Sequence, residues 1–66
     1  MKIIINGEEK EFTQDSTLEN VLEILGLGTK VMAAAVNMEI VKQDAWKSYI
    51  LSDGDKLELL DFVGGG

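Results

Sequence analysis

The chain has 66 residues, enough for one small domain, and its hydrophobic content of 45% predicts a packed core rather than disorder. It has no cysteine and no histidine, which excludes disulfides, thiolate metal sites and most nucleophile–base pairs. A net charge of -6 disfavours nucleic acid and anionic membranes as partners and favours a basic protein surface. No apolar run is long enough to span a bilayer and no signal-peptide layout is present, so we expect a cytoplasmic protein, monomeric when free.

The first predicted element is a β-hairpin. Residues 1–6 are rich in isoleucine, whose branched side chain favours a strand. Asn6-Gly7 predicts a type I′ turn, which needs a positive φ at both central positions. A second strand is expected over residues 8–13, where the alternation of side chains makes Phe12 the core anchor.

A short helix is predicted next. Ser16 and Glu19 have the spacing of a capping box, in which each side chain satisfies a free amide of the first turn. An apolar stripe then recurs at i, i+3, i+4 and i+7, formed by Leu18, Val21, Leu22 and Leu25. Gly26 is expected to end the helix in the left-handed conformation.

Further extended segments are predicted in the second half of the chain. Residues 31–36 are expected to form a strand whose three alanines pack closely under the helix, followed by a turn over residues 37–39. A brief extended piece at 40–41 leads into an irregular segment or one helical turn at 43–49, with Trp46 against the core. Asp53-Gly54-Asp55 predicts a turn rather than a calcium site, because the later ligands of an EF-hand loop are missing. The last strand is predicted over residues 56–63.

This order of elements defines the expected fold class. A hairpin places the first two strands side by side, and the one main helix must cover one face of the sheet. We therefore expect an α+β, ubiquitin-like β-grasp domain over residues 1–63, with a mixed sheet of four to five strands. Residues 64–66 are expected to form a flexible glycine tail, because glycine has no Cβ atom.

The glycine tail is the feature that points to chemistry. Three extended residues reach about 10 Å beyond the sheet, a shape suited to threading a narrow channel of another protein. The reacting group would be the α-carboxylate of Gly66, with Gly64 and Gly65 lying in the channel. A carboxylate must first be activated, usually as an acyl-adenylate, and this chain has no phosphate-binding loop of its own. The alternative is that the glycines are a frayed end without a function.

The last strand predicts a docking surface beside this tail. Alternation separates its residues into two faces, one with Leu57, Leu59, Asp61 and Val63 and the other with Glu58, Leu60 and Phe62. If Leu57 and Leu59 are in the core, Leu60 and Phe62 face outward as an apolar partner-binding pair. Glu58 and Asp61 belong to an acidic run that can guide a basic partner to the tail. The alternative is that Phe62 only covers an edge of the core.

Short pieces along the whole chain resemble the ThiS family of bacterial sulfur carriers in thiamine biosynthesis. The pieces are MKIIING at 1–7, AVNMEIV at 35–41, Trp46, Asp53-Gly54-Asp55 and the final LELLDFVGGG. By this resemblance, Gly65 and Gly66 match the family's terminal diglycine. Leu60 and Phe62 fall where family members contact partner enzymes.

The resemblance implies a carrier protein on which partner enzymes act, not an enzyme. A ThiF-like, E1-like adenylating enzyme would use ATP and magnesium to turn the Gly66 carboxylate into an acyl-adenylate, while the carrier itself binds no metal or cofactor. A sulfur donor, ultimately a cysteine desulfurase, would convert the adenylate into a thiocarboxylate. A ThiG-like thiazole synthase would then take the sulfur for the thiazole ring of thiamine.

Two alternative functions fit the same sequence. The small subunit of molybdopterin synthase uses the same carrier chemistry on this fold. Such chains tend to be longer and to carry proline before the tail, and this sequence has no proline. The other alternative is a β-grasp interaction module or protein tag that never carries sulfur, and a tag would form an isopeptide bond with a target lysine.

Overall fold

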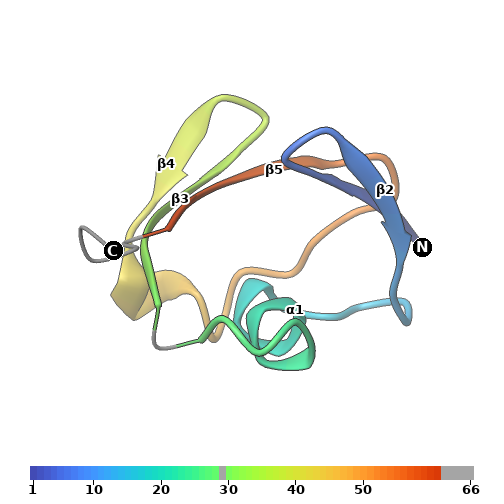
Figure 1. Cartoon of the computed structure of the whole chain (residues 1–66). Coiled ribbons are helices and arrows are strands. Elements are labelled where there is room, and N and C mark those ends of the chain that lie inside the picture. The colour runs from blue at the N-terminus through green and yellow to red at the C-terminus, as the bar shows by residue number, and fades with distance from the viewer. Residues whose placement is uncertain (29, 62–66) are drawn as a thin grey trace.

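A computed structural model describes residues 1–28 and 30–61 (Figure 1). Its elements are β1 (Lys2–Ile5), β2 (Glu8–Glu11), α1 (Leu18–Ile24), β3 (Val31–Val36), β4 (Glu39–Val41), the 3-10 helix η1 (Gln43–Ala45) and β5 (Lys56–Asp61). The five strands form one sheet in the order β2-β1-β5-β3-β4. The central strand, β5, is parallel to β1 and antiparallel to β3, and α1 covers one face of the sheet (Figure 1). The predicted α+β, β-grasp architecture with a mixed sheet is therefore confirmed.

Both hairpins of the sheet close through two-residue turns. Asn6 and Gly7 have φ values of 48° and 88°, which confirms the predicted type I′ turn. Asn37 and Met38 have φ values of 51° and 76° and form a turn of the same kind between β3 and β4. The predicted turn over residues 37–39 is one residue too long, because Glu39 already belongs to β4.

The start of α1 differs from the predicted capping box. The N-cap is Thr17 and not Ser16: the Thr17 hydroxyl accepts the Asn20 N–H, and the Asn20 side chain accepts the Thr17 N–H, each at 3.1 Å. Ser16 is buried, and its hydroxyl donates to the Thr13 carbonyl at 2.8 Å. Ser16 with Glu19 and Thr17 with Asn20 both have the i, i+3 spacing of a capping box. Spacing alone therefore could not place the first turn of the helix.

One hydrophobic core fills the space between α1 and the sheet. Its buried members include residues of β1, α1, β3, β4 and β5. Phe12 and Trp46 are buried as predicted, and the indole N–H of Trp46 donates to the Val41 carbonyl at 2.9 Å. Gly26 ends the helix with a φ of 74°, also as predicted. None of the helices within residues 1–28 and 30–61 has the length and hydrophobicity needed to cross a lipid bilayer.

The three consecutive alanines of β3 do not all pack under the helix. Ala34 is buried in the core, but its neighbours Ala33 and Ala35 are half-buried and line a groove on the other face of the sheet. The prediction was therefore wrong for Ala33 and Ala35. The reason is the alternation of side chains along a strand, which directs successive residues to opposite faces.

Candidate functional site

The last strand presents two of the predicted partner-binding residues on the face away from α1. Leu57 is fully buried and Leu59 is half-buried against the core. Glu58 is exposed, and Leu60 is 64% exposed although it is a large apolar side chain. The alternation predicted for the last strand is therefore confirmed over these four residues.

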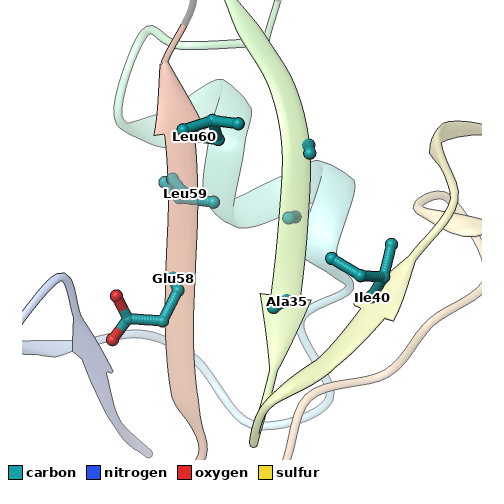
Figure 2. Close-up of a pocket in the computed structure, with 7 residues that line it drawn as sticks. Ala35, Ile40, Glu58, Leu59 and Leu60 are labelled. Atoms are coloured by element: carbon teal, nitrogen blue, oxygen red, sulfur yellow. The ribbon is translucent and has the colours of Figure 1, made fainter.

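A shallow apolar groove of about 220 Å³ lies beside Leu60 on this face, and we refer to it as the outer groove. Ala33 is the register partner of Leu60, while Ala35 is paired with Glu58 on β5 and with Ile40 on β4. Because each alanine side chain is a single methyl group, Ala33 and Ala35 form a low floor. Figure 2 shows Leu60 on one side of this floor and Ile40 on the other, carried by β5 and β4.

The composition of the outer groove suits a protein partner. Ile40 is 71% exposed, so it and Leu60 place two large apolar side chains in water on one face of the sheet. Exposed apolar side chains gathered around a hollow make this face a candidate interaction surface. Glu58 lies at the rim, and Figure 2 shows its carboxylate pointing away from β3, where a basic group of a partner can reach it.

The two aspartates of the turn before β5 have structural partners. Asp53 accepts the Lys2 N–H at 2.6 Å. Asp55 accepts the Ser52 N–H at 2.8 Å and the Asn37 side-chain amide at 2.9 Å. The Asp55 N–H also donates to the Ser52 carbonyl at 3.0 Å, which confirms the predicted turn. Within the part of the chain that the structure describes, no group of three or more His, Cys, Asp or Glu could hold a metal ion.

Several predicted site residues lie outside the described residues. They are Phe62, Gly64, Gly65 and Gly66, together with Val63 and the predicted domain boundary that follows it. Asp61 ends β5 as the register partner of Val31, but its side chain is also outside what the structure describes. The roles assigned to these residues stay predictions.

The sequence prediction missed the β3 and β4 side of the outer groove. The available signal was the alternation that separates Ala33 and Ala35 from Ala34, combined with an isoleucine at position 40 in a short extended piece. The alternation within β5 does not show that β5 lies next to β3, and this neighbourhood brings Leu60 to the alanine floor. The pairing of β3 with β5 also contains a shift in register between Val31 and Ala33, which the sequence pattern does not predict.

A mixed sheet of five strands in the order β2-β1-β5-β3-β4, covered by one helix, places the chain in the ubiquitin-like β-grasp class. Its sequence matches the ThiS family over residues 3–66. It is 30% identical to the sulfur carrier protein ThiS of Escherichia coli over 66 residues, the whole length of both chains. A crystal structure of the thiamine biosynthesis protein ThiS from Geobacter metallireducens is 26% identical, with a TM-score of 0.81 over all of both chains. The chain belongs to the ThiS family.

Its relatives differ in length. A thiazole synthase of Paramagnetospirillum magneticum is 42% identical over 66 residues, which are 100% of this chain but only 20% of that protein. The chain thus spans about a fifth of this longer relative. The Escherichia coli relative of matching length is named as a carrier and not as an enzyme.

Proposed function

We propose that this chain is a sulfur carrier whose Gly66 carboxylate is adenylated, converted to a thiocarboxylate and used as the sulfur source for the thiazole ring of thiamine. The observation that carries the proposal is the match to the ThiS family over residues 3–66. The Escherichia coli relative supports the carrier role, because it is named a sulfur carrier protein and aligns with this chain over the whole length of both.

Activation takes place on a partner, an E1-like adenylating enzyme that uses ATP and magnesium. A carboxylate oxygen of Gly66 attacks the α-phosphorus of ATP, pyrophosphate leaves and an acyl-adenylate forms. Persulfide sulfur from a cysteine desulfurase then attacks the carbonyl carbon, and AMP leaves with the oxygen. A thiol then attacks the desulfurase-side sulfur of the resulting acyl disulfide, which releases the thiocarboxylate and forms a disulfide between the thiol and the desulfurase cysteine. The net change on the carrier is one oxygen replaced by one sulfur.

Thiazole synthase is the proposed acceptor of this sulfur. The support comes from the longer relative named thiazole synthase, which contains a region similar to the whole of this chain. Two domains in one polypeptide are held at a high effective concentration, which favours transfer of a reactive group from one domain to the other. After transfer, the carrier regains its Gly66 carboxylate and can be loaded again.

The outer groove is the proposed docking surface for these partners. Leu60 supplies an exposed apolar anchor on the strand that leads towards the tail, and Phe62 is proposed to continue it. Glu58 and Asp61 are proposed to attract a basic partner surface, in keeping with the net charge of -6. Docking there would bring Gly64 and Gly65 to the entrance of a partner channel.

The proposed function is tested by the intact mass of the chain. The chain is incubated with ATP, magnesium, an E1-like adenylating enzyme already shown to load a carrier, and a cysteine desulfurase with cysteine. A mass gain of one sulfur minus one oxygen, located on the terminal glycine fragment, is expected, and omission of ATP should abolish it. An unchanged mass would contradict the proposal and favour an interaction module, whereas covalent adducts on target lysines would favour a protein tag.

The docking role of the outer groove predicts that Leu60→Lys weakens binding to the adenylating enzyme about tenfold or more. The reason is that the substitution places a charge in an apolar contact and opposes a basic partner surface. The dissociation constant is measured by titration calorimetry.

The matched control is Ile24→Lys. Ile24 is 66% exposed, slightly more than Leu60 at 64%, but it lies on α1, on the other side of the sheet. This variant should bind like the parent chain. Equal weakening by both substitutions would show that the outer groove has no special role.

A further inference from the structure

A side chain extends the pairing between β1 and β5. The register of these parallel strands covers two residue pairs, the last of which is Ile5 with Leu57. The Asn6 N–H then donates to the Leu57 carbonyl at 3.0 Å, and Asn6 Oδ1 accepts the Leu59 N–H at 2.9 Å. The side-chain amide of Asn6 thus replaces the next backbone carbonyl of β1, because the main chain turns away at Gly7.

The corresponding asparagine of the other hairpin acts at a different point of β5. Asn37 occupies the first position of its type I′ turn, as Asn6 does. Its Oδ1 accepts the Lys56 N–H at 3.0 Å, and its Nδ2 donates to Asp55 at 2.9 Å. Asn37 therefore holds the first residue of β5, whereas Asn6 holds Leu59, two residues before β5 ends.

We infer that Asn6 is a positioning residue for sulfur loading, which holds the C-terminal half of β5 at Leu59 on the β1 side. The inference rests on the proposed function. The register with β1 ends at Leu57, so the Asn6 side chain provides the hold on Leu59 from that side. On the other side, β3 pairs with β5 as far as Asp61, and the register shifts after the pair of Ala33 with Leu60. A residue that positions Leu59 and Leu60 affects how the Gly66 carboxylate is presented to the enzyme after docking. Misplacement of a reacting group by about 1 Å can lower the reaction rate up to about 100-fold.

Three substitutions separate this role from a general effect on the fold. Asn6→Gly keeps the turn, because glycine accepts a positive φ, but removes the acceptor for the Leu59 N–H. Asn6→Asp keeps both an acceptor oxygen and tolerance of the left-handed region. Asn37→Gly is the matched control, because it removes an asparagine from the same turn position at the other hairpin and releases β5 only at its start.

The test combines amide exchange of the full chain with single-turnover loading by the adenylating enzyme in the presence of ATP. In Asn6→Gly, exchange of the Leu59 amide should rise about tenfold or more. The single-turnover rate should fall about tenfold, while the dissociation constant for the enzyme changes less than about twofold. Asn6→Asp should restore the rate to within about twofold, and Asn37→Gly should load like the parent chain.

Two results would overturn the inference while leaving the proposed function in place. One is an unchanged loading rate in Asn6→Gly despite faster exchange at Leu59. The other is an equal loss of rate in Asn37→Gly, which would assign the effect to general loosening of β5. A parent chain that gains no sulfur at all would overturn the proposed function, and the role of Asn6 in loading with it.

Discussion

Deletion of Gly66 is expected to abolish sulfur loading and to leave the fold intact. The new terminal carboxylate of Gly65 would stop about 3.5 Å short of the position where adenylation takes place. Holding the reacting groups close together accounts for a large part of the rate enhancement in such reactions, so the loading rate should fall about 100-fold or more. The buried core residues that the structure describes lie between Ile3 and Leu57, so the melting temperature should be unchanged. Intact mass after a single turnover measures the first effect, and the fluorescence of the buried Trp46 follows the second.

A second variant tests the threading of the tail separately from its length. Gly65→Leu keeps the Gly66 carboxylate in place but adds a bulky side chain where a narrow channel is proposed, and loading should be lost again. Gly28→Ala is the control, because an added Cβ at Gly28 meets no atom within 4 Å and the backbone there does not require glycine. It should load normally. Normal loading by the deletion variant or by Gly65→Leu would mean that the carboxylate of Gly66 is not threaded into a partner.

Leu57→Ala is expected to have the largest effect on stability. Leu57 is fully buried in the central strand, where it pairs with Ile5 on β1 and Val36 on β3. Loss of a buried leucine side chain costs about 2–5 kcal/mol, because it removes apolar contacts and leaves a cavity. Small domains have a total free energy of unfolding of about 5 kcal/mol or little more, so the variant should keep only about 0–3 kcal/mol of it. Urea denaturation measures the change.

Leu60→Ala is the matched control for Leu57→Ala. The substitution is chemically identical and lies in the same strand, but Leu60 is 64% exposed. Its effect on the free energy of unfolding should stay within about 0.5 kcal/mol. A loss of stability comparable to that of Leu57→Ala would show that Leu60 is a structural residue and that the outer groove is not a free surface.

Local patterns were sufficient for most elements of the fold. Asn6-Gly7 predicted its turn because few other dipeptides accept a positive φ at both positions. The apolar stripe of α1 and the buried Phe12 followed from periodicity and alternation. The N-cap was assigned one residue too early, because Ser16 and Thr17 are both good capping residues and only the tertiary contacts bury one of them. The free energies of such alternatives differ too little for a local pattern to decide.

The candidate site was less accessible from sequence than the fold. The outward orientation of Leu60 followed from alternation, but the groove beside it depends on which strands are neighbours. The bond between Asn6 and Leu59 joins residues that are 53 positions apart, and it exists because the last strand inserts beside the first. Contacts of this kind are set by the order of strands in the sheet, which the hydrophobic pattern of a single strand does not encode.

The central position of β5 has a consequence for the synthesis of this protein. The hairpins β1–β2 and β3–β4 are joined in the sheet only through β5, which is the last of the described strands to leave the ribosome. Isolated two-stranded hairpins are marginally stable in water, so the earlier part of the chain has no complete core to fold around. We therefore expect a nascent chain that stops before β5 to stay unfolded and exposed to cellular proteases. The folded state is thus reached only by chains whose translation has proceeded through the strand that leads to residues 62–66.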